Sequence, residues 1–370
     1  MKKPILATML SCEGTTLSDF EKKLFSEHNP LGISLFGRNI SSKTQLKQLI
    51  SEIKECLERD DVLIAVDQEG GRVRRLTGPE FTPCISQKQI GKIYEDYGAE
   101  KAKEIVQAHA VLISQDFHQV GINWNYAPVI DAFYPTTSKV LAGRSFSLPE
   151  DATVCLAQTM IDTYHQQSIC TCIKHLPSLA EAQNDPHLEL PIVSLTRQQL
   201  QQTLLTAQQL KNVPAAMTAH ILYTQIDDKL PATQSPKVIK EIIRQEIGFD
   251  GFLISDALDM HALKGSLALK TQLALDAGCD CICYCHGNPQ ELLEVCKNAR
   301  PLHDKSLQRL QKMQDIIKAP HKTVDIPKLK QDYSEFSANL DNYDEGYDAT
   351  EVLHQMDILN KGEKLCGHGY

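Results

Sequence analysis

The side chains best suited to chemistry in this sequence lie in two short segments. Pro186 separates Asp185 from His187, removes a backbone donor and holds Asp185 extended. At this spacing the Asp185 carboxylate can accept from one ring nitrogen of His187, leave the other nitrogen free for proton transfer and stabilise the imidazolium. Asp256 ends an apolar run, where a partly desolvated carboxylate could act as a nucleophile toward an anomeric carbon. The alternatives are an ordinary polar loop for the first segment and a helix cap for Asp256.

A second group of residues could hold a polyhydroxylated ligand. Gly70 and Gly71 allow a sharp turn after Asp67, and Arg75 follows closely. A carboxylate and a guanidinium in one loop can pair with vicinal hydroxyls. A plain helix cap remains the alternative interpretation of Asp67.

Four further positions carry polar side chains. Lys174 and His175 are adjacent donors, but neighbours on an extended chain face opposite ways, so we expect one of them to support the other rather than touch a ligand. His220 is interpreted as a packing histidine with satisfied nitrogens and is left out of the catalytic set. Asp259 is expected to face the helix that follows it.

The elements that position these residues follow from the hydrophobic pattern. Short apolar, β-branched runs alternate with longer amphipathic stretches, which predicts a parallel sheet with helices outside it. About eight such units would close a barrel, so we predict an α/β fold with a single (β/α)8 TIM-like barrel. Residues 5–10, 31–36, 62–66, 122–126, 169–173, 215–218, 252–255 and 281–284 are the expected strands, and residues 20–25 (after a Ser18 cap), 45–57, 99–118, 196–210, 237–246 and 271–277 the expected helices.

Polar residues recur just past the ends of these strands. Because the carboxyl ends of parallel strands share one rim of a barrel, and active sites lie on that rim, five such positions in succession predict one site. They are Asp67, Asp131 (with Arg144 further on), Lys174 with His175, His220 and Asp256.

Composition and charge narrow the class of protein. The chain is 42% hydrophobic and 23% charged, as is ordinary for a globular protein. Its 38 basic and 47 acidic side chains give a formal net charge of -9, which argues against a nucleic-acid partner. No run of eighteen or more apolar residues could span a bilayer. We expect a monomer with no membrane partner.

The N-terminus and the cysteines bear on the compartment. The apolar run after Lys3 is short for a signal peptide, begins with proline and is interpreted as the first barrel strand. The 12 cysteines lie largely inside predicted elements rather than at disulfide-framework spacing. We therefore expect a cytoplasmic protein.

One cysteine cluster needs its own interpretation. Cys279, Cys281, Cys283 and Cys285 would point to one face of a strand, with neighbours roughly 6–7 Å apart. A thiolate metal site is one interpretation. Small apolar filler in a packed strand is favoured, because CxC lacks the CxxC spacing of zinc sites and free cysteine behaves as a small hydrophobe.

The pattern changes near residue 320, which predicts a barrel domain over 1–318 and a polar C-terminal extension over 319–370. The extension is acidic in patches and weakly periodic. For its end, residues 366–370, a frayed and partly disordered terminus is favoured over a small metal-binding or partner-binding tail.

Taken in order, the segments of the chain resemble glycoside hydrolase family 3, and within it the β-N-acetylglucosaminidases of cell-wall recycling (the NagZ type). Each segment is a weak signal, but the ordered set is specific. The segments are 35–39 (LFGRN), 66–73 (VDQEGGRV), 127–131 (APVID), 143–146 (GRSF), 174–177 (KHLP), 185–187 (DPH), 235–236 (SP) leading to 248–249 (GF), 255–260 (SDALDM) and 277–280 (AGCD).

The resemblance implies a mechanism and a substrate. It places Asp256 at the family's nucleophile, His187 at its histidine acid/base and Asp185 at the partner that orients this histidine. It implies retention of the β anomer, no metal or other cofactor, and a small carbohydrate substrate, a terminal N-acetylglucosamine on 1,6-anhydro-N-acetylmuramic acid with or without peptide. The residues that it implies for binding the terminal sugar are Asp67, Arg75, Arg144, Lys174 and His175.

The chain departs from the family at one loop. Where members usually read Pro-Gly-His-Gly-Asp, Pro177 is followed by Ser178, Leu179, Ala180 and Glu181. Losing two glycines and a histidine predicts altered mobility of the loop that carries the acid/base rather than loss of the chemistry.

The departure leaves rival functions open. A barrel that binds sugar without turnover is one. A family 3 glycosidase or phosphorylase with a different β-glycoside specificity is another, since a histidine acid/base tolerates phosphate better than a carboxylate would.

Overall fold

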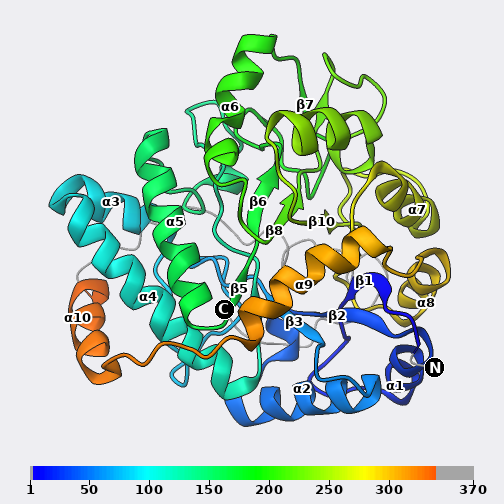
Figure 1. Ribbon diagram of the computed structural model, residues 1–370, viewed down its shortest axis with the longest axis horizontal. Coiled ribbons are helices and arrows are strands. Elements are labelled where there is room, and N and C mark those ends of the chain that lie inside the picture. The colour runs from blue at the N-terminus through cyan, green and yellow to red at the C-terminus, as the bar shows by residue number, and fades with distance from the viewer. Residues whose placement is uncertain (1–2, 339–370) are drawn as a thin grey trace.

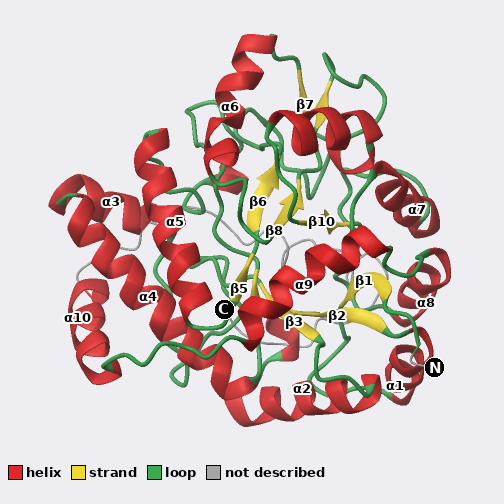
Figure 2. Ribbon diagram, in the orientation of Figure 1, coloured by secondary structure: helices red, strands yellow, loops and turns green. Residues whose placement is uncertain are grey.

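The apolar runs form one sheet of parallel strands that curls into a barrel with helices around it (Figures 1 and 2). Neighbouring strands pair in the order β5-β4-β3-β2-β1-β11-β10-β8-β6. The computed structural model describes residues 3–338. The barrel strands are β1 (Leu6–Leu10), β2 (Pro30–Leu35), β3 (Leu63–Val66), β4 (Trp124–Asn125), β5 (Cys170–Thr171), β6 (Ile173–Leu176), β8 (Ala215–Thr218), β10 (Phe252–Ala257) and β11 (Cys281–Cys283).

The barrel has nine strand segments but eight strand positions. β5 and β6 are two halves of one extended stretch, interrupted at Cys172. β5 pairs with β4, and β6 pairs with β8 on the opposite side, so this broken strand nearly closes the barrel. The predicted α/β TIM-like barrel is therefore confirmed.

Helices cover the outside of the sheet, and a small second sheet lies beside it. The second sheet pairs β7 (Ile192–Val193) with β9 (Leu222–Tyr223). The helices are α1 (Asp19–His28), α2 (Lys43–Leu57), α3 (Gln87–Tyr97), α4 (Ala99–Val120), α5 (Glu150–Gln166), α6 (Arg197–Gln209), the π-helix η4 (Val238–Glu246), α7 (Leu267–Ala277), α8 (Pro289–Asn298), α9 (Asp304–Lys318) and α10 (Ile326–Ala338), with 3-10 turns η1 (Gly37–Asn39), η2 (Lys139–Leu141) and η3 (Ala232–Gln234). No helix within residues 3–338 is both long and apolar enough to cross a bilayer.

Local sequence signals explain most element boundaries. Ser18 caps α1 as expected: its hydroxyl accepts from the amide of Glu21, and the Glu21 carboxylate accepts from the amide of Ser18 at 2.8 Å. The run after Pro4 forms β1. Two strands differ from prediction: β10 runs on through Asp256, and β6 contains Lys174 and His175, which we expected after the strand end.

The structure describes only residues 319–338 of the predicted C-terminal extension. Residues 319–338 include α10, which packs against α4 (Figure 1). The acidic patch at 341–345 and the terminal segment 366–370 lie outside the described residues.

Candidate active site

A pocket at the carboxyl ends of the barrel strands gathers nearly all the predicted site residues. The space inside it, which is open to solvent, is about 810 Å³. Residues 187 and 256, 69 positions apart, line this same pocket. The predicted residues on its wall are Asp67, Arg75, Arg144, Lys174, His175, His187 and Asp256, and Asp185 lies directly behind His187.

The Asp185–His187 pair has the predicted geometry. The Asp185 carboxylate lies 2.7 Å from Nδ1 of His187 and also accepts from the His187 backbone amide at 2.9 Å. Burial would raise the pKa of Asp185, but the hydrogen bonds and charge of His187 outweigh it and lower that pKa. An ionised Asp185 holds the ring through Nδ1, and Nε2 is the nitrogen on the opposite side of the ring.

Asp256 stands near the end of β10, with its side chain 15% exposed. Its carboxylate accepts from the amide of Ala257 at 2.8 Å, and its own amide donates to the Thr218 hydroxyl at 3.3 Å. Burial raises the pKa of Asp256, but His220, His175 and the Ala257 amide overcome this effect and lower it. Asp256 is thus held as a carboxylate, the form that a nucleophile needs.

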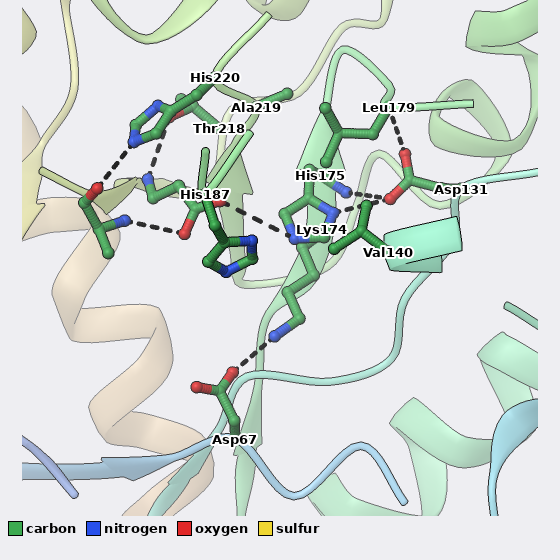
Figure 3. Close-up of polar contacts among 12 residues, drawn as sticks. Asp67, Asp131, Val140, Lys174, His175, Leu179, His187, Thr218, Ala219 and His220 are labelled. Carbon is green, nitrogen blue, oxygen red and sulfur yellow. Dashed lines mark hydrogen bonds and ion pairs between the residues drawn. The ribbon is translucent and has the colours of Figure 1, made fainter. Parts of the chain in front are cut away.

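The ring of His175 lies between Asp256 and a buried carboxylate, Asp131. Figure 3 shows the contact between His175 and Asp131. Nδ1 of His175 lies 2.7 Å from the Asp131 carboxylate, and its Nε2 lies 4.0 Å from the Asp256 carboxylate. Asp131 also accepts from the backbone amides of His175 at 3.0 Å and Leu179 at 2.6 Å. Asp131 therefore sets the orientation of a ring that faces the nucleophile candidate.

A charged network occupies the other side of the pocket. Glu69, 1% exposed, accepts two 2.8 Å hydrogen bonds from Arg144 and one contact of 2.6 Å from Lys174. Lys174 also reaches Asp67 at 2.6 Å, as Figure 3 shows, and Arg75 lies 3.7 Å from Asp67. Five charged side chains thus form one surface of donors and acceptors for hydroxyl groups.

The network fixes its own charge state. Burial would raise the pKa of Glu69, but the charges of Arg144 and Lys174 hold it well below the usual range. Burial opposes the charge of Lys174 as well, yet Asp67 and Glu69 keep its pKa above the usual value.

Hydrogen bonds hold the loop over residues 178–181, where the sequence departs from the family. The Ser178 hydroxyl donates to Asp131 at 3.3 Å, and the Ser178 carbonyl accepts from Tyr223 at 2.6 Å. The Ala180 carbonyl accepts from the Thr137 hydroxyl at 2.5 Å. Leu179 lines the pocket. Whether the mobility of this loop differs from that of relatives remains a prediction.

The structure corrects two sequence expectations and meets a third. Lys174 and His175 both line the pocket, because the pairing of β6 is irregular between Lys174 and Leu176 and simple alternation fails there. Asp259, expected only to face α7, also lines the pocket: it accepts from the amide of Cys285 at 2.9 Å and lies 3.3 Å from Nε2 of His286, while its charge acts on Lys270 of α7 as well. His220 is fully buried, and both its ring nitrogens have partners, as expected.

Sequence reasoning missed Glu69 as the centre of the charged network and Asp131 as the partner of His175. Asp131 carried a signal, since it follows a predicted strand. Glu69 lies two residues past Asp67 in the glycine loop, but the residues that give it a role are far away in the chain.

The cysteine cluster is buried. The Cys279 thiol contacts the Thr233 carbonyl at 3.7 Å, and the sulfur atoms of Cys283 and Cys285 lie 3.5 Å apart on the pocket wall. Burial raises the pKa of Cys279 and Cys281 well above the usual value, so both stay as thiols. Within residues 3–338, no three His, Cys, Asp or Glu side chains gather as metal ligands would.

An ionised carboxylate, an imidazole held by a second carboxylate, and a charged surface for hydroxyls suit cleavage of a glycosidic bond. The fold and the site therefore define the class of glycoside hydrolases.

Known proteins place the chain within that class. Residues 6–314 match the glycosyl hydrolase family 3 N-terminal domain. A β-hexosaminidase of Alkalilimnicola ehrlichii is 33% identical over 310 residues, 82% of this chain and 87% of that protein. The crystal structure of NagZ from Neisseria gonorrhoeae in complex with N-trifluoroacetyl-D-glucosamine has a TM-score of 0.80 and 27% identity, and covers 90% of this chain and 98% of that one.

The chain belongs to glycoside hydrolase family 3. Among the members of that family it is a hydrolase of the β-hexosaminidase kind.

Proposed function

We propose that this protein is a retaining exo-β-N-acetylglucosaminidase with Asp256 as nucleophile and His187 as acid/base. The observation that carries the proposal is that Asp256, kept ionised, and His187, oriented by Asp185, line one pocket although they lie far apart in the chain. Family membership supports the same assignment.

The proposed reaction has two steps. The Asp256 carboxylate attacks the anomeric carbon, the bond to the aglycone oxygen breaks, and that oxygen takes the proton from Nε2 of His187. His187 then removes a proton from water, which attacks the glycosyl ester and releases Asp256. Two inversions give net retention of the β anomer.

The charged network supports the binding half of the proposal. Asp67, Glu69, Arg144, Lys174 and Arg75 present fixed donors and acceptors where the hydroxyls of a terminal sugar would lie. An N-acylated glucosamine is the favoured sugar, because the neisserial relative is described in complex with one. We propose as substrate a terminal N-acetylglucosamine on 1,6-anhydro-N-acetylmuramic acid or its peptide, cleaved in the cytoplasm during peptidoglycan recycling. The cysteines at described positions are all free, in keeping with a reducing compartment.

The test compares aryl N-acetyl-β-glucosaminides with good and poor leaving groups. His187→Ala should lower kcat/KM far more for the poor leaving group, because only that substrate needs the proton. Asp256→Asn should abolish release from both substrates. Equal losses with both leaving groups in His187→Ala would refute the acid/base assignment.

Product analysis separates the rival activities. Hydrolysis with retention predicts the β anomer of N-acetylglucosamine as the first product. An α anomer would contradict the double displacement. A sugar phosphate that forms only when inorganic phosphate is added would show phosphorolysis instead.

A further inference from the structure

Two hydrogen bonds hold the start of the segment after α9 against the end of α5 and the turn that follows it. The amide of Lys322 donates to the carbonyl of Gln166 at 2.8 Å, and the Ser168 hydroxyl donates to the carbonyl of Ala319 at 2.6 Å. Farther on, α10 lies beside α4 (Figure 1). Tyr333 of α10 is 1% exposed, and Ile326 and Leu329 of the same helix also pack against the core.

The Tyr333 hydroxyl contacts the chain segment just before α3. It donates to the carbonyl of Pro83 at 2.8 Å and accepts from the amide of Ile85 at 3.3 Å. Nδ1 of His109, on α4, lies 3.0 Å from the same oxygen, and Nε2 of His109 lies 3.7 Å from the sulfur of Cys84. Since the hydroxyl proton is given to Pro83, His109 must donate through Nδ1 and accept through Nε2.

His109 is a neutral member of this cluster. Burial lowers the pKa of His109 to about 4, and burial raises the pKa of the Cys84 thiol to about 12. At neutral pH every donor in the cluster therefore has an acceptor, and no charge is buried.

A single peptide group connects this cluster to the pocket. The carbonyl of Cys84 accepts from the amide of Gly71 at 2.9 Å, while the amide of the same peptide, that of Ile85, donates to Tyr333. In a trans peptide these two groups point in opposite directions. Tyr333 and Gly71 thus hold the two sides of one peptide plane.

Gly70 adds a steric contact to this hydrogen bond. Its φ is +106°, and a Cβ atom at this position would lie 1.9 Å from the carbonyl oxygen of Ile85. The glycine loop therefore rests directly on the segment that Tyr333 holds.

We propose that Tyr333 is a positioning residue for the sugar-binding loop, and that α10 thereby supports the binding side of the pocket. The loop over residues 67–75 carries Asp67, Glu69 and Arg75 into the pocket. Tyr333 fixes the Cys84–Ile85 peptide, and this peptide in turn holds the loop through Gly71, so Tyr333 limits the positions of these three side chains. The effect on substrate affinity rests on the proposed function, since it assumes that this loop binds the terminal sugar.

The experiment compares Tyr333→Phe with the intact full-length protein by amide hydrogen exchange and mass spectrometry. The variant keeps the ring and removes only the hydroxyl, which leaves the Ile85 amide, the Pro83 carbonyl and His109 without that partner. Amides of residues 68–86 should exchange about tenfold faster, with little change in the strands. Tyr134→Phe, at a tyrosine that is 38% exposed, is the matched control and should leave exchange of residues 68–86 unchanged.

A kinetic measurement separates positioning from general stability. For an aryl N-acetyl-β-glucosaminide, KM should rise roughly tenfold in Tyr333→Phe while kcat stays within about twofold, at a temperature well below unfolding. Unchanged exchange in 68–86, or faster exchange spread evenly over the barrel, would overturn the proposal. If neither the intact protein nor the variant cleaves the substrate, the proposed function fails, and the exchange data still decide the role of Tyr333.

Discussion

Replacing Glu69 by glutamine should destabilise the fold far more than an ordinary charge deletion. Glu69 is 1% exposed and accepts two hydrogen bonds from Arg144 and one contact from Lys174. Glutamine keeps the shape but has one acceptor oxygen and turns an NH2 group toward a cation. Lys174 retains Asp67, so Arg144 is the buried charge that loses its partner. Breaking a buried ion pair on one side typically costs about 3–5 kcal/mol, and we expect a value in that range for Glu69→Gln.

Urea unfolding of the two proteins, followed by circular dichroism, measures this cost. The control is Asp96→Asn, which breaks the exposed Lys92–Asp96 pair, whose side chains are 39% and 44% exposed, and should cost less than about 1 kcal/mol. Adding Arg144→Met to Glu69→Gln removes the orphaned charge, so the double variant should lose less than the sum of the two single losses. A loss in Glu69→Gln no larger than that of the control would refute the view that this network is desolvated and mutually dependent.

Three further outcomes follow from the site. Asp131→Asn should lower kcat/KM about tenfold or more with little change in KM, which steady-state kinetics checks. The amide has one acceptor oxygen, so it cannot serve both His175, which bonds Oδ2 through its ring Nδ1 and backbone amide, and the Leu179 amide, which bonds Oδ1. Gly70→Ala should destabilise the pocket loop, since the added methyl meets the Ile85 carbonyl, and thermal unfolding and KM measure the effect. Burial gives His109 a pKa of about 4 in the folded protein against 6.5 in the unfolded chain, so the free energy of unfolding should fall by up to about 3 kcal/mol as pH falls from 6.5 to 4. In His109→Asn, urea unfolding at several pH values should show a flatter curve over this range.

The sign of the His109 effect follows from which state binds the proton more tightly. Burial lowers the folded pKa, so between pH 6.5 and 4 the unfolded chain takes up a proton that the fold excludes. The stability that the neutral ring provides is complete above pH 6.5 and is lost as pH falls toward 4. A steeper acid loss in His109→Asn than in the parent protein would contradict this assignment.

The sequence allowed the barrel and the Asp185–His187 contact to be predicted because both are local signals. Alternating apolar runs and amphipathic stretches identify strands and helices wherever they occur. The Asp185–His187 contact spans two residues, so its geometry follows from the chain itself and from Pro186. Asp256 was predicted from its place at the end of an apolar run, which is also local.

The rest of the site depends on contacts that only the closed barrel creates. Lys174 meets Asp67 across 107 positions, and Arg144 meets Glu69 across 75 positions. Asp259 faces the pocket because the Cys285 amide holds it there, a contact that no periodicity encodes. Tyr333 was invisible for the same reason, since its three partners lie more than 220 positions away.

The electrostatics of the pocket explain why an imidazole suits the proposed acid/base better than a second carboxyl. Asp256 must stay ionised to attack, and His175 and His220 lower its pKa by their position. A carboxylic acid near that carboxylate would have its own pKa raised by like-charge repulsion, and the two would compete for one proton. His187 carries its proton as a cation, so its charged form lowers the pKa of Asp256 instead of opposing its ionisation. The role of Asp185 is testable: Asp185→Asn replaces the carboxylate that holds Nδ1 of His187 by a neutral amide, so kcat/KM should fall more for a poor leaving group than for a good one, and an equal fall with both would contradict the reasoning.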